Sequence, residues 1–167
     1  SVLCKDPVVY IDDRWLYDRE DELPPIVELD LKSQKPLITQ KGVDITIVAS
    51  GHASLLASGA SVKLRKKGVS AEVIDIRVLN PLNVDVIIES VIKTKHFLVV
   101  DSGWISTGFS GEIVAKVVEK LPVDCLNKSP VRIALPDASA PTSRVLEKAY
   151  YTSVDDVVNG AKNILNN

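Results

Sequence analysis

The chain has 167 residues, of which 46% are hydrophobic and 25% are charged, and its formal net charge is −2 at pH 7. These are the proportions of an ordinary globular domain. The slight acidity gives no attraction to nucleic acid or to an anionic membrane, and no apolar run approaches the roughly 20 residues that span a bilayer. We therefore expect one main folded domain, with neither nucleic acid nor membrane as a partner.

Cysteine and histidine are scarce in this sequence. The two cysteines, Cys4 and Cys125, lie far apart and form no Cys-x-x-Cys pair; this pattern suits a reducing compartment, so we expect a cytoplasmic protein. The two histidines, His52 and His96, are too few for a His-rich metal site. Methionine is absent, even at position 1, which indicates a processed chain or part of a longer one.

Residues 1–42 differ in pattern from the rest of the chain. Residues 7–11 (PVVYI) predict one short strand, and residues 12–25 (DDRWLYDREDELPP) form an acidic, aromatic segment that ends in two prolines. Residues 26–42 alternate apolar and polar side chains, as an extended connector with short edge strands does. Because a self-contained domain rarely opens on so long an irregular segment, we predict an interdomain linker arm over residues 1–42 and a domain over residues 43–167.

The linker arm carries the first candidate interface residues, which are Arg14, Trp15 and Tyr17. Aromatic and arginine side chains dominate the energetics of many protein contacts, and here they stand between acidic residues. We therefore predict that this segment lies against a partner. The alternative is a solvated arm that folds back onto its own domain.

From residue 43 onward, apolar runs alternate with amphipathic segments. Expected strands cover residues 44–50, 71–79, 96–102 and 131–135, and expected helices cover residues 52–67, 83–95, 111–121 and 154–166. Strands that are apolar throughout, each followed by a helix, are typical of a parallel sheet that is covered on both faces. With right-handed crossovers, this order predicts an α/β fold with three layers, Rossmann-like, in which a mostly parallel sheet has helices on both faces.

Residues 103–110 (GWISTGFS) come within one residue of a P-loop. Their glycine spacing and Ser110 fit that motif, but Phe109 stands where the phosphate-binding Lys is required. An active nucleotide site is therefore not expected, and anion binding by the amides that open the next helix is the weaker alternative. We predict a strand-to-helix loop with Trp104 and Phe109 as candidate contact residues.

Two further positions are candidates for chemistry. His52 follows a strand and opens a helix, where functional residues of parallel α/β proteins gather, yet no Ser-His-Asp, Cys-His or nucleophile-elbow pattern accompanies it. Asp137, in the loop of residues 135–147, is a candidate interface residue; pairing of its carboxylate with Glu147 or Glu112 is the catalytic alternative. We assign no catalytic, cofactor-binding or metal-binding residue from the sequence.

Several motifs follow one another in a recognisable order. They are DPVVYIDDRWLY (6–17), GVDITIV (42–48), EVIDIRVLNPLNVDVIIESVIKT (72–94), GWISTGFSGEI (103–113) and VRIALPDASAPTSRVLE (131–147). Together they resemble the C-terminal domain of the beta subunit of thiamine-diphosphate-dependent 2-oxo acid dehydrogenases, the first component of the pyruvate and branched-chain dehydrogenase complexes. Family members often carry Glu at the position of Asp101, Gly at that of Leu135 and Pro at that of Ser139, and these departures indicate a divergent branch of the family that the chain resembles.

The resemblance implies a transketolase-like C-terminal domain with a role in assembly. In that family, the alpha subunit and the beta subunit's N-terminal domain share the site for thiamine diphosphate and Mg²⁺, and their motifs are absent from this sequence. The resemblance therefore implies that this chain alone does not bind the cofactor and is inactive. The implied partners are its own N-terminal pyrimidine-binding domain, the alpha subunit, the lipoyl acyltransferase core and a second copy in a homodimer.

The leading prediction is thus an assembly and dimerisation domain of an oxidoreductase. The complete enzyme would decarboxylate a 2-oxo acid, with pyruvate as the first choice, and reductively acylate lipoyl groups. One alternative is the corresponding domain of a split transketolase, which the scarcity of basic residues and His in the loops disfavours. The other is a free-standing module that binds a small anion through residues 103–110.

Overall fold

The computed structural model describes residues 7–20, 22, 25, 30–31 and 33–165. The strands are β1 (Leu37–Gln40), β2 (Ile45–Ala49), β3 (Ala71–Asp75), β4 (Phe97–Trp104) and β5 (Val131–Leu135), and the helices are α1 (His52–Arg65), α2 (Asp85–Thr94), α3 (Phe109–Val118), α4 (Arg144–Tyr150) and α5 (Val154–Leu165). A short 3-10 turn, η1 (Arg14–Leu16), precedes them. None of the helices in the described part of the chain has the length and apolar character needed to cross a bilayer.

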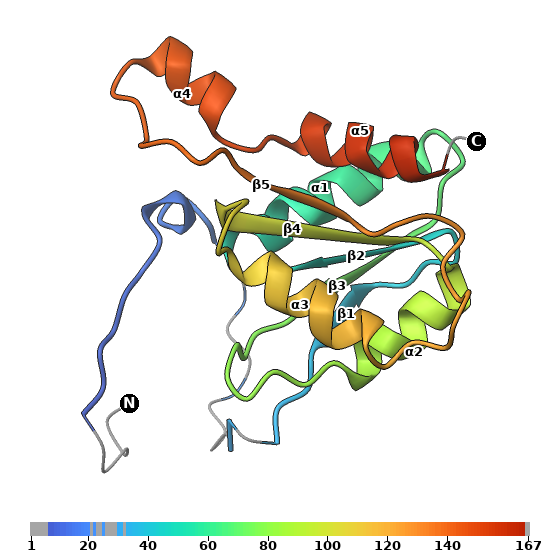
Figure 1. Ribbon diagram of the computed structural model, residues 1–167. Coiled ribbons are helices and arrows are strands. Elements are labelled where there is room, and N and C mark those ends of the chain that lie inside the picture. The colour runs from blue at the N-terminus through green and yellow to red at the C-terminus, as the bar shows by residue number, and fades with distance from the viewer. Residues whose placement is uncertain (1–6, 21, 23–24, 26–29, 32, 166–167) are drawn as a thin grey trace.

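The five strands form one sheet in the order β1-β3-β2-β4-β5, with helices on both of its faces (Figure 1). Strands β3, β2, β4 and β5 are parallel, whereas β1 joins the edge antiparallel to β3. The predicted three-layer α/β fold with a mostly parallel sheet is thereby confirmed. Strand β1 falls inside residues 1–42, so the end of the predicted linker arm is a strand of this same sheet.

Each face of the sheet has its own hydrophobic core. Helices α1 and α5 cover one face, where Leu64 and Ile47 belong to the same buried cluster. Helices α2 and α3 cover the other face, where Ile87 and Val48 are buried together. Because successive strand residues point to opposite faces, the neighbours Ile47 and Val48 serve different cores, and both are fully buried. Coverage of both faces explains why the strands are apolar throughout.

Every helix and strand expected after residue 43 is present, with ends shifted by a few residues, but three segments differ from expectation. The prediction of a strand over residues 7–11 is wrong. Residues 9–11 are at least 83% exposed, and no strand in the described part of the chain pairs with this apolar run, so it joins no sheet. Strand β3 ends at Asp75 because Arg77, with φ of 60°, turns the chain away. Helix α4 lies in a region expected to be a loop.

Residues 7–20, which we call the aromatic arm, extend from the body of the domain (Figure 1). The rest of the linker-arm prediction falls partly on residues 1–6, 21, 23–24, 26–29 and 32, which lie outside the described residues. Cys4 lies outside them as well, and Cys125 carries a free, half-buried thiol.

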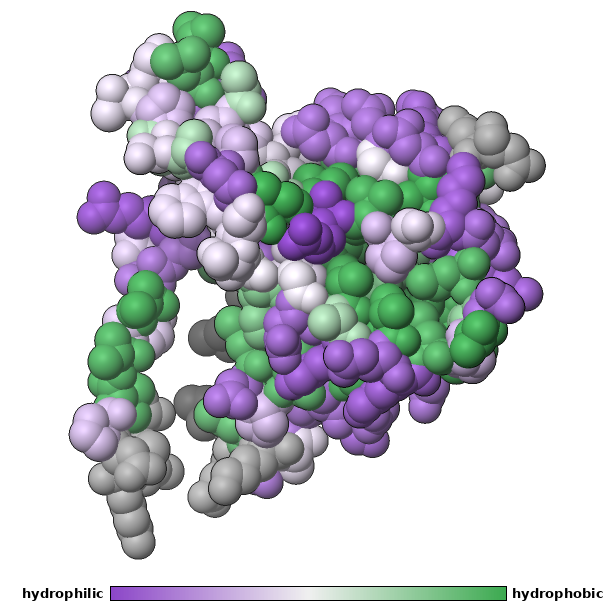
Figure 2. Space-filling view, viewed as in Figure 1, coloured by the Kyte–Doolittle hydropathy of each residue, from purple (hydrophilic) through white to green (hydrophobic). Residues whose placement is uncertain are grey.

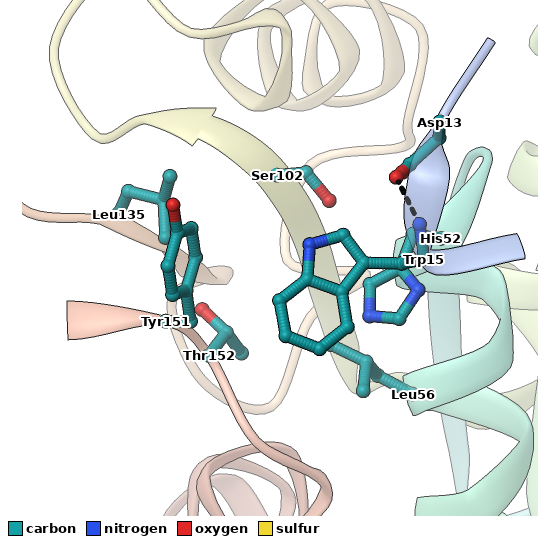
Figure 3. Close-up of a pocket in the computed structure, with 8 residues that line it drawn as sticks. All are labelled: Asp13, Trp15, His52, Leu56, Ser102, Leu135, Tyr151 and Thr152. Carbon is teal, nitrogen blue, oxygen red and sulfur yellow. Dashed lines mark hydrogen bonds between the residues drawn. The ribbon is translucent and has the colours of Figure 1, made fainter. Parts of the chain in front are cut away.

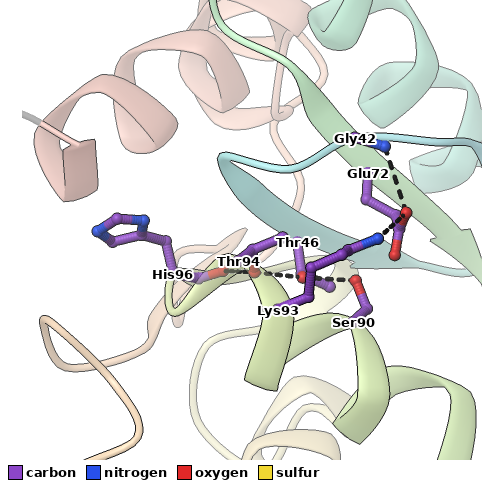
Figure 4. A network of polar contacts seen from close by, with 7 residues as sticks. All are labelled: Gly42, Thr46, Glu72, Ser90, Lys93, Thr94 and His96. Atoms are coloured by element: carbon purple, nitrogen blue, oxygen red, sulfur yellow. Dashed lines mark hydrogen bonds and ion pairs between the residues drawn. The ribbon is translucent and has the colours of Figure 1, made fainter.

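Buried polar groups join α2 to the sheet (Figure 4). The carboxylate of Glu72 in β3 is 2% exposed and accepts hydrogen bonds from Lys93 Nζ at 2.6 Å and from the Gly42 amide at 3.2 Å. Nearby, the hydroxyls of Thr46 and Ser90 lie 2.7 Å apart. Burial alone would raise the pKa of Glu72, but the hydrogen bonds from Lys93, Ser90 and Gly42 hold that pKa below its usual value.

We predict that Glu72→Gln lowers the free energy of unfolding at pH 7 by about 1–2 kcal/mol, because a charge-assisted hydrogen bond with Lys93 is lost. The folded-state pKa of Glu72 is depressed, so this stabilisation is present above the unfolded-state pKa of about 4.3 and is lost as the pH falls through the folded-state pKa. Urea unfolding of both proteins at pH 7 and at several values below pH 4 measures the difference.

The difference between the two proteins should shrink in acid, and a difference that stays constant with pH would contradict the role given to the Glu72 charge. Glu119→Gln is the matched control. Glu119 is exposed at the end of α3, so its substitution should change stability little at any pH.

Candidate binding pocket at the carboxyl edge of the sheet

The strand order creates a crevice at one edge of the sheet. Strand β2 has β3 on one side and β4 on the other, and the helix that follows β2 lies on the opposite face from the helix that follows β4. In open α/β sheets, ligands bind at such a switch point, outside the carboxyl ends of the strands. His52 directly follows the β2 turn and Ser102 lies near the end of β4, so both flank this crevice.

A cavity of about 420 Å³ occupies the crevice, and we call it the carboxyl-edge pocket. Its walls come from the aromatic arm, α1, the ends of β4 and β5, and the segment that follows α4 (Figure 3). The lining residues are Asp13, Trp15, His52, Leu56, Ser102, Leu135, Tyr151 and Thr152. A volume in this range, roughly 300–1,000 Å³, is typical of sites for small molecules.

Trp15 forms the outer wall of the carboxyl-edge pocket. Its indole lies 5.6 Å from the ring of His52 and meets Tyr151 edge to face at 6.0 Å, measured between ring centroids. Asp13 fixes the η1 turn by accepting a hydrogen bond from the Trp15 amide at 3.0 Å. The Trp15 side chain remains 64% exposed. The aromatic arm therefore touches its own domain here, and contact of this segment with a partner stays a prediction.

Several polar groups in the carboxyl-edge pocket lack a hydrogen-bond partner within the described part of the chain. Nδ1 of His52 is buried and unpartnered. The hydroxyls of Ser102 and Thr152 and the indole N–H of Trp15 likewise make no hydrogen bond to a described residue. Among the described lining residues, Asp13 alone carries a charge, and none is Lys or Arg.

The connection from β4 to α3 is organised by a carboxylate of the protein itself. Asp101 accepts hydrogen bonds from the amides of Gly103 at 2.8 Å and of Ser110 at 2.7 Å, the latter in the first turn of α3. Gly108 passes so close to Trp104 that a Cβ there would lie 2.0 Å from the Trp104 carbonyl oxygen. The carboxylate of Asp101 thus takes the place at the start of α3 that a bound anion would need. This geometry argues against both the P-loop and the anion-binding alternatives.

The interface candidates of this region lie on and beside the same connection. Trp104 is 52% exposed, and its indole N–H donates to the Tyr150 hydroxyl at 3.0 Å. Phe109 is half-buried against the core beneath α3. Asp137 accepts hydrogen bonds from the amide of Ser106 at 3.1 Å and from its hydroxyl at 2.6 Å. Asp137 therefore joins the β5–α4 loop to the β4–α3 connection.

The other interface candidates, Arg14 and Tyr17, lie outside the β4–α3 connection. Arg14 and Tyr17 lie exposed on the aromatic arm, where the Tyr17 hydroxyl donates to the Asp12 carboxylate. The catalytic alternative for Asp137 finds no support, because Asp137 engages Ser106, and Glu112 pairs with Lys116 at 3.1 Å. In the residues that the structure describes, no group of three or more His, Cys, Asp or Glu side chains is arranged to hold a metal ion.

Sequence reasoning missed most of the carboxyl-edge pocket. Ser102, Tyr151 and Leu56 were not singled out, because each looks like an ordinary strand, loop or helix residue in the sequence. Position in the chain was the one indication of the pocket in the sequence, because residues that end or directly follow parallel strands lie together at the carboxyl edge of the sheet. His52 was noticed for this reason, but its apolar neighbours were not.

The fold and the site together define a Rossmann-like α/β domain with a small pocket at the switch point of its sheet. The model of the family described as "Transketolase, C-terminal domain" matches residues 34–157. The chain belongs to this family, and the resemblance noted in the sequence is confirmed.

Curated relatives place the similarity in one kind of subunit. The chain is 30% identical over 169 residues to the mitochondrial pyruvate dehydrogenase E1 component subunit beta of Mus musculus, which covers 99% of this chain and 47% of the relative. It is 32% identical over 166 residues to the Saccharomyces cerevisiae subunit, with 96% and 44% coverage. It is 30% identical over 157 residues to the Rhizobium meliloti subunit, with 94% and 34% coverage. The chain thus spans about half the length, or less, of these relatives.

Solved structures confirm the fold. The chain superposes on a "split gene transketolase, inactive beta4 tetramer" with a TM-score of 0.72 at 22% identity, covering 87% of this chain and 46% of that one. The 2-oxoglutarate:ferredoxin oxidoreductase from Magnetococcus marinus gives a TM-score of 0.55 at 14% identity, with 81% and 20% coverage. At these identities, the superpositions establish the shared fold alone.

We predict that Asp101→Ala lowers the free energy of unfolding by about 1–2 kcal/mol, because the first turn of α3 loses its side-chain acceptor. Amide hydrogen exchange at Gly103 and Ser110 should accelerate, while exchange in β2 should change no more than the loss of global stability requires. Glu119→Ala, an exposed carboxylate at the opposite end of α3, serves as the control. Unchanged exchange at both amides would show that Asp101 does not hold the connection.

Proposed function

We propose that this chain is the C-terminal half of a 2-oxo acid dehydrogenase beta subunit, with pyruvate as the substrate of the complete enzyme. The observation that carries the proposal is the similarity over 99% of the chain to 47% of a pyruvate dehydrogenase E1 beta subunit. In this proposal the domain builds the assembly, and other parts of the enzyme decarboxylate the 2-oxo acid and reductively acylate lipoyl groups.

The donor set of the carboxyl-edge pocket does not fit thiamine diphosphate and Mg²⁺. A magnesium pyrophosphate needs several oxygen ligands and positive charge, whereas the described lining residues supply one carboxylate, Asp13, and no Lys or Arg. We therefore place the cofactor of the complete enzyme outside this chain, on an N-terminal pyrimidine-binding domain and an alpha subunit. The isolated chain supplies no catalytic residue in this scheme.

Exposed apolar side chains support an assembly role. In the aromatic arm, Val9, Tyr10 and Ile11 are 83%, 83% and 86% exposed, and Figure 2 shows this apolar run standing clear of the body. Trp104 adds a half-exposed indole beside α3. Exposed apolar surface of this kind marks contact regions. The proposed partners are the N-terminal domain, the alpha subunit, the lipoyl acyltransferase core and a second copy of the chain.

A split transketolase is the second candidate, favoured by the superposition on a split gene transketolase tetramer. Its substrates would be sugar phosphates, whose phosphate groups require basic side chains. The described lining of the carboxyl-edge pocket has none, but it disfavours the carboxylate of a 2-oxo acid equally. The first proposal is preferred because of the sequence similarity to pyruvate dehydrogenase beta subunits. Reconstitution with the missing half distinguishes the two.

We expect no turnover from the 167-residue chain alone when pyruvate, thiamine diphosphate, Mg²⁺ and lipoyl acceptor are supplied. Addition of an N-terminal beta domain and an alpha subunit from the same organism should restore pyruvate-dependent acylation of the acceptor. Decarboxylation by the isolated chain would contradict the assembly role. Ketol transfer between sugar phosphates by the reconstituted enzyme, without acylation, would select the transketolase alternative.

We also predict that Trp104→Ala weakens association of the reconstituted enzyme about tenfold or more, since half-exposed aromatic rings are frequent contact hot spots. Sedimentation velocity across a concentration series measures the assembly constant. Ser129→Ala is the control, because Ser129 is an exposed polar residue in the loop that leads to the opposite, amino end of β5. Equal association of both variants and the wild type would remove Trp104 from the interface.

A further inference from the structure

We propose that the carboxyl-edge pocket binds a neutral, flat, largely apolar small molecule that carries a hydrogen-bond-accepting atom on one edge. This site is separate from the assembly role proposed above and does not depend on it. The inference rests on where the pocket lies, what lines it, which of its polar groups are unpartnered and how charge is distributed around it.

The position of the pocket points to a ligand. It lies at the switch point of the sheet, between the turn that follows β2 and the end of β4. Crevices at this point of open α/β sheets are where ligands bind as a consequence of topology. A cavity of about 420 Å³ is large enough for a ring system and too small for a folded partner.

The walls point to a flat ring. Trp15, Tyr151 and His52 present ring faces and edges to the cavity, and Leu56 and Leu135 close its sides (Figure 3). Aromatic side chains favour offset or edge-to-face packing with other rings. The indole of Trp15 lies tilted against the His52 ring and edge to face with Tyr151, so the wall of the cavity offers aromatic surfaces against which a further ring can pack.

The free polar groups point to an acceptor on the ligand. Figure 3 shows the indole nitrogen on the side of the Trp15 ring that faces Ser102. Neither the Trp15 N–H nor the hydroxyls of Ser102 and Thr152 bond to another described residue. Each of these groups can donate a hydrogen bond. A carbonyl oxygen or ring nitrogen placed among them would accept from donors that the protein leaves unused.

The buried nitrogen of His52 is the second unpartnered feature. Nδ1 is buried and has no hydrogen-bond partner in the described part of the chain. Buried polar atoms are usually paired, because an unpaired one costs free energy. Trp15 covers this ring, so the imidazole forms part of the aromatic wall behind the indole.

The charges of the described lining residues disfavour anions. Asp13 is the one charged side chain among the described lining residues, and no Lys or Arg accompanies it. A carboxylate or phosphate in the cavity would be repelled by Asp13 and would lose its hydration without compensation. The ligand class therefore differs from 2-oxo acids and from sugar phosphates.

Binding would also fix the aromatic arm. Two of the walls, Asp13 and Trp15, belong to the arm, and the others belong to the domain. A molecule held between them adds contacts to both sides and therefore stabilises the docked position of the arm. Arg14, exposed in η1, gives a direct measure of docking, because trypsin cleaves after it when the arm is free.

The test uses the full 167-residue chain and a matched pair of probes, 1-naphthamide and 1-naphthoate. These have the same ring system, but one is neutral with a carbonyl acceptor and the other is an anion at pH 7. Nitrogen–proton correlation spectra resolve the two indole N–H signals, which Trp104→Phe assigns. We expect saturable binding of the amide, a shift of the Trp15 signal with the Trp104 signal unchanged, and affinity for the carboxylate at least tenfold weaker.

Two variants locate the site. Ser102→Ala should weaken binding of the amide about three- to tenfold through loss of one donor, and Tyr151→Ala should weaken it at least as much through loss of a wall. Ser102 is exposed, so its substitution leaves the core intact. Ser129→Ala, an exposed serine in the loop that precedes β5, should bind like the wild type. Bound amide should slow tryptic cleavage after Arg14 in the wild type, and at the same subsaturating concentration it should slow this cleavage less in Ser102→Ala.

Four outcomes would overturn the proposal. The first three are the absence of saturable amide binding at millimolar concentration, equal affinity for the amide and the carboxylate, and a shift of the Trp104 signal in place of the Trp15 signal. A Trp15 signal that moves with protein concentration in the absence of any probe would instead identify a side chain of a second copy as the occupant. That result would also overturn the small-molecule assignment. None of these outcomes bears on the reconstitution assay, so the two proposals fail independently.

Discussion

The pairing of β2 with two parallel neighbours is the constraint from which the rest of the structure follows. All five residues of β2 are buried, and the strand pairs with β3 on one side and β4 on the other. Because both faces of the sheet are covered, no β2 residue can be polar without an internal partner, and Thr46 has one in Ser90. The loops that follow β2 and β4 are then forced to opposite faces, which opens the crevice where the carboxyl-edge pocket forms.

A second constraint decides what kind of chemistry that edge can support. The amides at the start of α3 would suit an anion, but Asp101 already accepts from the Ser110 amide. Asp101 therefore supplies the acceptor for these amides without a ligand, whereas the buried hydroxyl of Ser110 has no hydrogen-bond partner in the described part of the chain. The neighbouring carboxyl-edge pocket is the better candidate for ligand binding. It is lined by aromatic rings and unpaired hydrogen-bond donors, whereas a phosphate site requires positive charge. Electrostatics, more than shape, separates this domain from a nucleotide-binding one of similar layout.

The alternation of strands and helices could be predicted from the sequence, since buried strands and amphipathic helices have distinct periods. The misplaced elements show the limit of that reasoning. Residues 7–11 have the composition of a strand, yet a strand exists only when another strand pairs with it, and pairing is a property of the whole fold. The pocket could not be predicted from the sequence for a related reason. Trp15, Ser102 and Tyr151 are far apart in the chain, and only the crossover order brings them together.

The exposed run in the aromatic arm has a consequence for how the chain exists in a cell. Residues 9–11 are apolar, β-branched or aromatic, and at least 83% exposed, while β5 ends the sheet with one edge unpaired by any other strand of that sheet. Exposed apolar segments and unpaired strand edges of this kind favour aggregation when nothing covers them. Wherever nothing else covers these segments, copies of the chain would tend to associate with one another through them.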